Sequence, residues 1–184
     1  MVALFLTSDF EEIEAVSAID VLRRGGVGVE AISLTGELVV KGAHSISIHA
    51  DKLFDKADFN YEMIVLPGGK GTANYLKNPD FTRFVPKFYG QGGYVAAICA
   101  APTVLGNLGL LNGKKAVCYP GMEEQLKCAE DGVKDVEIDG RIITSKGPGT
   151  SISFSLAILK ILAGKACADE VARGLLADYS NSRK

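Results

Sequence analysis

The beginning of the chain constrains the fold more than any other part of it. A continuous apolar run at 2–6 predicts a buried strand, and apolar residues at helical spacing over 13–22 predict a helix. Gly25 and Gly26 end that helix, and a second apolar run at 27–34 predicts another strand. A strand, a helix and a strand form a βαβ unit, which predicts a parallel sheet covered by helices on both faces.

The same alternation continues along the chain. Asp9 and Glu12 predict a capping box at the start of the first helix, and Asp139-Gly140 predicts a hairpin turn. No linker or repeat interrupts the pattern, so residues 1–184 are expected to form one domain. The expected later strands are 61–66, 94–98, 115–119, 136–138 and 142–144. The expected helices are 71–77, 80–90, 102–108, 151–163 and 168–177. Two short segments, 38–40 and 45–49, are expected to pair as an antiparallel excursion from the main sheet.

The composition excludes several classes of function. The net charge of the 184 residues is −2, so no basic surface is available for nucleic acid or an anionic membrane. No apolar run approaches the ~20 residues of a membrane span. The apolar N-terminus lacks a positive segment and is interrupted by Asp9, which favours a strand over a signal peptide. A cytoplasmic location is therefore expected.

The cysteines and histidines do not predict a metal or cofactor site. The four cysteines at 99, 118, 128 and 167 form no C-x-x-C pair, and reduced thiols are the expectation in the cytoplasm. His44 and His49 have opposite parities on one expected strand, so they do not converge on one metal. Neither histidine lies near Cys99 in the sequence. No cofactor and no metal are expected.

Residues 94–102 combine an apolar strand, a cysteine and a helix start. Cys99 follows the strand, Ala100 and Ala101 leave room for a sharp turn, and Pro102 suits the first helical turn. This order is typical of a nucleophile elbow. A thiol at a helix N-terminus is expected to favour the thiolate. The alternative, that Cys99 is a small buried hydrophobic residue, is equally compatible with this segment.

Three turns meet at one edge of such a sheet, because ligand sites lie beyond the carboxyl ends of parallel strands. These turns carry Glu14, Gly68-Gly69 and Cys99. A carboxylate near a thiolate has a raised pKa, and a protonated Glu14 can donate to the sulfur. The alternative is a solvated helix-start acid. The N–H groups of the glycine turn and Ala100 can form an oxyanion hole; the alternative is a turn that simply needs positive φ.

Five blocks in this order resemble the ThiJ/PfpI superfamily, in its Parkinsonism-associated deglycase (DJ-one) branch and of the bacterial type. The resemblance covers nearly the whole chain, and the order of the blocks is more specific than any one of them. The blocks are Glu11–Val16, Asp20–Gly26, Val65–Gly69, Ala96–Thr103 and Thr144–Ser151.

The resemblance implies a flavodoxin-like three-layer α/β/α sandwich with a mainly parallel central sheet, and a homodimer. It implies that Cys99 is the reactive, oxidation-prone cysteine, that Glu14 hydrogen-bonds it, and that Gly69 and Ala100 supply backbone donors. The implied activities are cofactor-free glyoxalase or deglycase chemistry on α-oxoaldehydes or their adducts. The alternative is a redox sensor and chaperone of oxidative stress, in which the cysteine becomes a sulfinic acid without steady-state turnover.

One residue departs from the pattern of that superfamily. Several relatives place a histidine near the cysteine, after the fifth strand, where this chain has Tyr119. A tyrosine hydroxyl is a poor base near neutral pH because its pKa is about 10. Glu14 is then the remaining candidate for the general base; otherwise general base catalysis is weak. Ala100 argues against the peptidase-like branch, which has histidine at that position.

Overall fold

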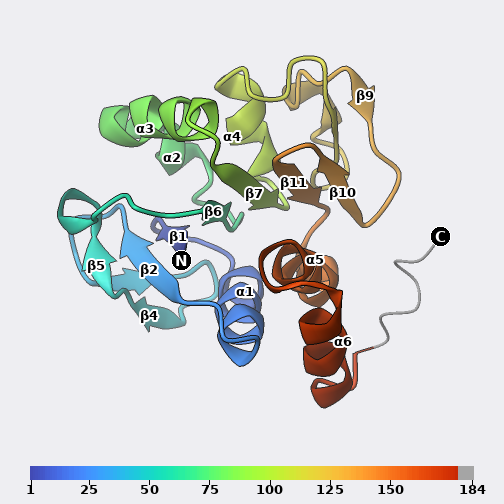
Figure 1. Cartoon of the computed structure of the whole chain (residues 1–184). Helices are drawn as coiled ribbons and strands as arrows, with labels where there is room; N and C mark the ends of the chain where they lie inside the picture. The colour runs from blue at the N-terminus through green and yellow to red at the C-terminus, as the bar shows by residue number, and fades with distance from the viewer. Residues whose placement is uncertain (178–184) are drawn as a thin grey trace.

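The central element of the computed structural model, which describes residues 1–177, is a sheet of seven strands in the order β10-β11-β7-β6-β1-β2-β5 (Figure 1). Every neighbouring pair is parallel except β10 and β11. The mainly parallel sheet predicted from the sequence is confirmed. The strands are β1 (Val2–Leu6), β2 (Val29–Ser33), β5 (Lys52–Leu53), β6 (Met63–Leu66), β7 (Tyr94–Ile98), β10 (Val136–Asp139) and β11 (Ile142–Ser145).

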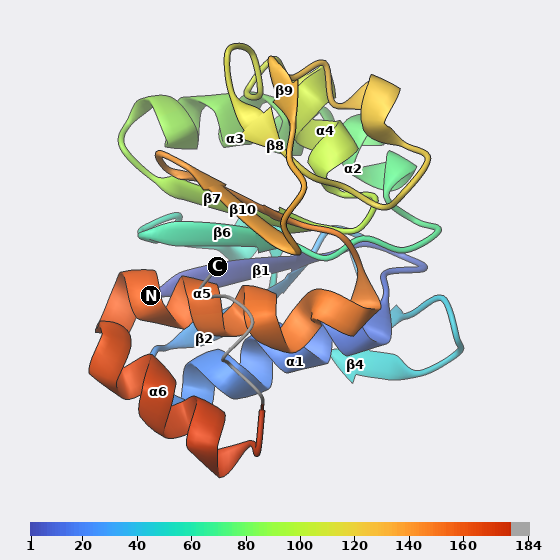
Figure 2. The same ribbon diagram turned by 90° about the vertical axis from the view of Figure 1, so that its right-hand side faces the viewer.

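Helices cover both faces of the sheet (Figure 2). One layer holds α1 (Glu12–Arg24), α5 (Ser151–Ala163) and α6 (Lys165–Gly174). The opposite layer holds α2 (Ala73–Lys77), α3 (Pro79–Gly90) and α4 (Pro102–Asn107). The strands alternate between these layers: Leu4 packs on the α1 side and Phe5 on the α3 side, as a strand buried on both faces requires.

Two small sheets lie outside the main one. Strands β3 (Val39–Lys41) and β4 (Ser47–His49) form the predicted antiparallel hairpin. Strands β8 (Lys115–Ala116) and β9 (Glu130–Asp131) pair in parallel. Short 3₁₀ turns occupy Phe54–Lys56, Glu123–Gln125 and Pro148–Thr150. Among the described residues no helix is both long and apolar enough to cross a membrane.

The order of the strands opens a crevice between β1 and β6. The chain extends the sheet from β1 to β2 on one side, then returns to β6 and continues to β7 on the other. The helix after β1 covers one face and the helices after β6 cover the opposite face. The loops at the carboxyl ends of these two strands therefore separate, which is where ligands bind in sheets of this kind.

Three local predictions were wrong. The strand expected at 115–119 ends at Ala116, because the next N–H, of Val117, donates to the Thr144 side chain at 3.0 Å. The last helix is Lys165–Gly174, three residues earlier than expected at each end. The first helix is capped by Glu11, whose carboxylate accepts from the Glu14 N–H at 2.8 Å, and the expected Asp9–Glu12 box is absent. The expected domain also includes residues 178–184, which lie outside the described residues.

Candidate active site

Cys99 lies at a sharp turn between β7 and α4. Its φ is 64°, in the left-handed region that costs energy for a residue with a side chain. Two backbone hydrogen bonds hold this conformation: the Cys99 N–H donates to Ser145 O at 2.9 Å, and the Tyr119 N–H donates to Cys99 O at 2.7 Å. Pro102 occupies the first turn of α4, as expected. The segment therefore has the geometry of the predicted elbow.

The glycine turn after β6 packs directly against this elbow. A Cβ on Gly68 would lie 2.8 Å from the Cys99 Cβ and 2.9 Å from the Ala100 nitrogen. Gly69 has a φ of 103°, so it also meets the simpler requirement of a turn with positive φ. The N–H groups of Gly69 and Ala100 lie beside the Cys99 sulfur and lower the pKa of its thiol. The turn therefore meets the simpler reading, and an oxyanion hole at these two N–H groups stays a prediction.

Glu14 is buried beside the thiol, with 1% of its surface exposed. Its Oε2 accepts from the Gly68 N–H at 2.7 Å. Its Oε1 is buried without a hydrogen-bond partner among the described residues, while the Cys99 thiol interacts with the carboxyl. Burial, and to a smaller extent the Glu11 carboxylate, raise the pKa of Glu14 to about 7. The alternative of a solvated helix-start acid is therefore wrong.

The helix start does not acidify Cys99 on balance. Burial first, and then the Glu14 carboxylate, raise the pKa of the Cys99 thiol to about 12, although the N–H groups of Gly69 and Ala100 lower it. The expectation of a thiolate favoured by the helix start alone is wrong in its net direction. Between pH values of about 7 and about 12 the pair formed by Glu14 and Cys99 therefore holds one proton, which these two pKa values place on the thiol.

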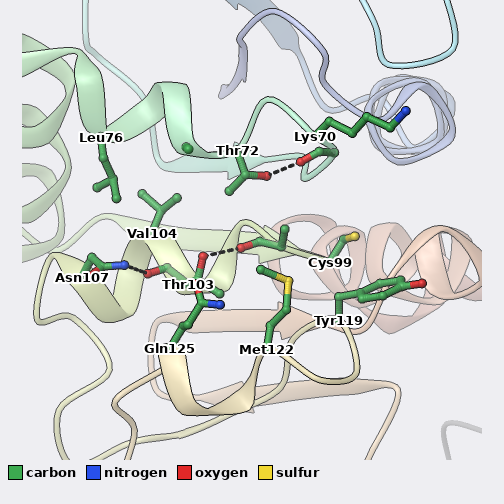
Figure 3. Close-up of a pocket in the computed structure, with 13 residues that line it drawn as sticks. Lys70, Thr72, Leu76, Cys99, Thr103, Val104, Asn107, Tyr119, Met122 and Gln125 are labelled. Carbon is green, nitrogen blue, oxygen red and sulfur yellow. Dashed lines mark hydrogen bonds between the residues drawn. The ribbon is translucent and has the colours of Figure 1, made fainter.

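A cavity of about 500 Å³ opens beside the thiol (Figure 3). Residues of the glycine turn and α2 form one wall, α4 forms another, and the segment from Tyr119 to Gln125 forms the third. Tyr119 is half exposed, and its ring lies 3.4 Å from the position of a Cβ on Gly147. The walls contributed by Leu76 and Gln125 were not foreseen, because α2 and the turn at Glu123–Gln125 carry no motif that places them near Cys99.

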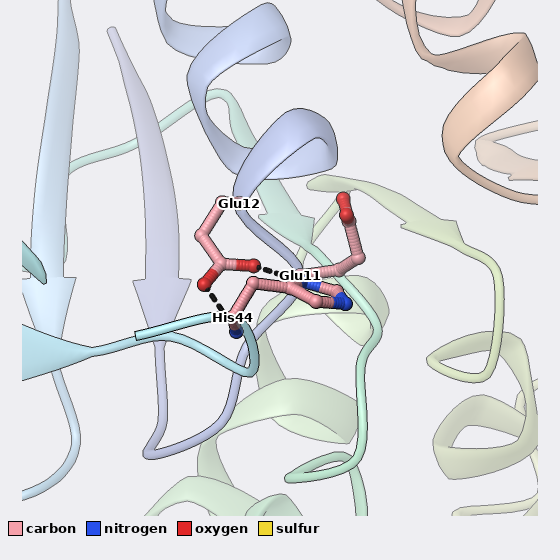
Figure 4. Close-up of side chains that lie close together, drawn as sticks. All are labelled: Glu11, Glu12 and His44. Carbon is pink, nitrogen blue, oxygen red and sulfur yellow. Dashed lines mark hydrogen bonds and ion pairs between the residues drawn. The ribbon is translucent and has the colours of Figure 1, made fainter. Parts of the chain in front are cut away.

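A second cluster joins Glu11, Glu12 and His44, with one potential ligand atom of each within 4.8 Å of the others (Figure 4). Glu12 accepts from the His44 N–H at 2.6 Å and contacts His44 Nδ1 at 2.8 Å, while Glu11 caps α1. These contacts tie the β3–β4 hairpin to the first turn of α1. His44 lies in the turn between β3 and β4, so the prediction that both histidines share one strand was wrong; only His49 lies in β4.

The other three thiols lie away from this cavity. Cys118 is buried, whereas Cys128 and Cys167 are half-buried. Burial raises the pKa of Cys118 to about 12 and also raises that of Cys128. None of the described cysteines forms a disulfide. Cys99 is the cysteine of the described chain that combines a cavity, a strained backbone and a buried acid.

A cysteine on a strand–helix elbow, at the switch point of a mainly parallel sheet, defines a class of α/β proteins with a buried thiol site. The DJ-1/PfpI family matches residues 1–161, and the chain belongs to that family. The resemblance inferred from the sequence is thereby confirmed.

Individual relatives agree with this assignment. The chain is 40% identical to Protein dj-1beta of Drosophila melanogaster, over 96% of this chain and 97% of that protein. It is 46% identical to Protein DJ-1 homolog A of Arabidopsis thaliana over 90% of its own length, but spans only 44% of that protein. The solved structure of Toxoplasma gondii DJ-1, oxidized, superposes with a TM-score of 0.93 at 36% identity, covering 97% of this chain and 98% of that one. The chain is a DJ-1-type protein.

Proposed function

We propose that this protein is a cofactor-free enzyme that uses Cys99 to act on α-oxoaldehydes or their adducts, in defence against carbonyl and oxidative stress. The observation that carries the proposal is the buried Glu14 carboxyl, which accepts from the Gly68 N–H through Oε2 and interacts with the Cys99 thiol. One proton shared by a thiol and a carboxyl supplies both a nucleophile and an acid without any cofactor.

The reaction with methylglyoxal begins by transfer of the thiol proton to Glu14. The Cys99 sulfur attacks the aldehyde carbon, the carbonyl electron pair moves onto oxygen, and Glu14 gives that oxygen its proton. The N–H groups of Gly69 and Ala100, which lower the pKa of the thiol in the free protein, then stabilise the oxyanion as it forms. The product of this step is a hemithioacetal.

The second half of the reaction moves a proton between two carbons. Glu14, now ionised, removes the proton from the former aldehyde carbon, and the hydroxyl proton on that carbon passes to the neighbouring oxygen of the enediolate. Glu14 then gives its proton to the neighbouring carbon, which leaves a lactoyl thioester on Cys99. Water then attacks the thioester, sulfur leaves as the thiolate, and lactate is released; one proton of the water returns to the pair and the other passes to solvent. A pKa of about 7 suits Glu14 to both directions of transfer.

Steady-state turnover of methylglyoxal tests this proposal. Glu14→Gln keeps an oxygen for the Gly68 N–H and a donor for the sulfur but cannot exchange a proton, so kcat should fall about 10²–10⁴-fold. Glu14→Asp withdraws the carboxyl by one methylene and should give an intermediate loss. Cys167→Ser is the control, because that thiol lies far from the cavity and only contacts Gly25 O. Unchanged turnover in Glu14→Gln would show that Glu14 is not the proton shuttle.

A second candidate function is favoured by one comparison. The related Toxoplasma structure is described as oxidized, which is consistent with a redox sensor of the same site. In this case the Cys99 sulfur attacks one oxygen of a peroxide and releases hydroxide, and a second peroxide converts the sulfenic acid to sulfinic acid. A sensor gains two oxygen atoms at Cys99, detected by mass spectrometry, without turning over methylglyoxal. An enzyme shows turnover before any oxidation.

We also propose that the protein is a cytoplasmic homodimer and that each chain forms one domain. Exposed apolar side chains gather on α1, at Ile13 and Val16, and on the adjoining β3–β4 hairpin, at Val39 and Ile46. A patch of this kind on a small protein favours a protein interface. Cys128 and Cys167 are partly exposed and unpaired, which fits a reducing compartment.

A further inference from the structure

The cavity beside Cys99 is larger than a three-carbon substrate requires. Cavities of about 300–1,000 Å³ hold drug-sized ligands, and this one measures about 500 Å³. Its length follows α4, whose Thr103, Val104 and Asn107 all line it. A rise of 1.5 Å per residue places Asn107 about 6 Å farther along the helix than Thr103. The cavity therefore accommodates a substituent that extends away from the reacting carbon.

The polar side chains along this cavity have few hydrogen bonds to offer a ligand (Figure 3). Thr103 Oγ1 donates to Ala100 O at 2.8 Å, and Asn107 Nδ2 donates to Thr103 O at 2.9 Å. Thr72 Oγ1 donates to Gly69 O at 2.8 Å. These three side chains direct their donors into their own backbone. Tyr119 and Gln125, both exposed, are the other lining residues with uncharged polar side chains, and the rest of the lining is chiefly carbon surface.

Apolar side chains from two elements supply that surface. Leu76 of α2 and Val104 of α4 lie on opposite walls, and Met122 lies near the thiol end (Figure 3). Among the lining residues Lys70 carries the formal charge, and its side chain points away from the cavity in Figure 3. A charged substituent placed between Leu76 and Val104 would lose water against carbon surface, whereas an apolar one gains from the transfer.

We propose that this cavity selects α-oxoaldehydes that carry an uncharged aryl or branched-alkyl substituent, in preference to methylglyoxal, and that Leu76 is a specificity-determining residue. The inference rests on the proposed function and specifies its substrate class. The substituent lies between Leu76 and Val104 while the aldehyde carbon faces Cys99. Leu76 then affects the choice between substrates without touching the reacting atoms.

The first test compares kcat/KM for phenylglyoxal and methylglyoxal in wild type and Leu76→Gln. Leu76 is 39% exposed, so a polar residue of similar size is tolerated by the fold. The preference for phenylglyoxal should fall about tenfold in Leu76→Gln, which is typical of lost apolar contact in a specificity pocket. Because the ratio of kcat/KM for the two aldehydes is compared between proteins, the difference in their intrinsic reactivity cancels. Leu176→Gln, at an exposed leucine outside the cavity, should leave the preference unchanged.

The second test needs no turnover. The rates at which iodoacetamide and its N-phenyl derivative alkylate Cys99 are measured in the same proteins and divided by their rates with glutathione. The phenyl reagent should be favoured in wild type and lose that advantage in Leu76→Gln. A preference that Leu76→Gln leaves unchanged in both tests overturns the inference, even if methylglyoxal is turned over. Absent turnover together with the expected labelling preference overturns the proposed function and leaves the apolar cavity supported.

Discussion

Replacing Glu14 by glutamine should change the pH dependence of folding stability in a calculable way. The side chain is buried, and burial raises its pKa from an ordinary 4.5 to about 7 in the folded protein. Between these values the folded state binds more protons than the unfolded state, so stability falls as pH rises through this window. The difference between the two pKa values corresponds to about 3 kcal/mol. Glutamine keeps the contact to Gly68 but does not titrate.

The measurement is urea unfolding of wild type and Glu14→Gln at pH 4 and pH 7.5. The difference in unfolding free energy between them should shift by about 3 kcal/mol in favour of the variant on going to pH 7.5. For a chain of this size that corresponds to about 10 °C in Tm. The upper pH lies well below the second transition of the pair, so the Cys99 thiol adds little.

The control is Glu124→Gln, which removes an exposed carboxylate from the turn at Glu123–Gln125. All other titrating groups are common to the compared proteins and cancel in the difference. A stability difference between wild type and Glu14→Gln that is equal at the two pH values would refute the argument. It would mean that Glu14 reaches water or a compensating charge when the protein is folded.

Other parts of the site make equally specific predictions. If the proposed transfer of the thiol proton to Glu14 operates, alkylation of Cys99 should speed up as Glu14 ionises with rising pH and should precede labelling of the other three thiols, as checked by peptide mass spectrometry; earlier labelling of another cysteine would contradict that transfer, because a pKa of about 12 would then keep Cys99 protonated. Gly68→Ala forces a Cβ to 2.8 Å from the Cys99 Cβ, so it should lower the free energy of unfolding by about 1–3 kcal/mol, measured by thermal or urea unfolding. The control Gly149→Ala should leave stability nearly unchanged, because a Cβ there meets nothing within 4 Å. Light scattering should give about 39 kDa, twice the chain mass of 19.5 kDa, and Val16→Asp should give the monomer; a wild-type monomer at micromolar concentration would refute the dimer.

The sequence predicted those parts of the site that depend on topology. In a parallel sheet the loops after successive strands share one edge, so Glu14, Gly68 and Cys99 were expected together, and the Gly68 N–H does bind Glu14. The elbow was predictable because small residues and a proline follow the strand without interruption. Both arguments use only local pattern and the order of elements.

The features that the sequence did not predict depend on contacts between distant segments. Asp9 fits a capping pattern, but its N–H donates to Lys41 O and its φ is 61°, so the hairpin determines its conformation and Glu11 becomes the cap. The bonds from Glu12 to the hairpin span 32 residues. The direction of the Cys99 pKa shift depends on burial, to which the glycine turn after β6 contributes. A motif specifies the chemical groups, whereas packing decides how they titrate.

Two of the groups around the thiol belong to the backbone, which limits what mutation can remove. The N–H groups of Gly69 and Ala100 persist in any substitution that preserves the turns, including Cys99→Ala. A protein without the thiol therefore keeps two N–H donors beside the position that the sulfur occupied. We expect such a variant to hold an anion or a carbonyl substrate there, which would suit crystallography. In descendants of this chain, one base change can replace the cysteine, whereas the two N–H groups remain as long as the backbone keeps these turns.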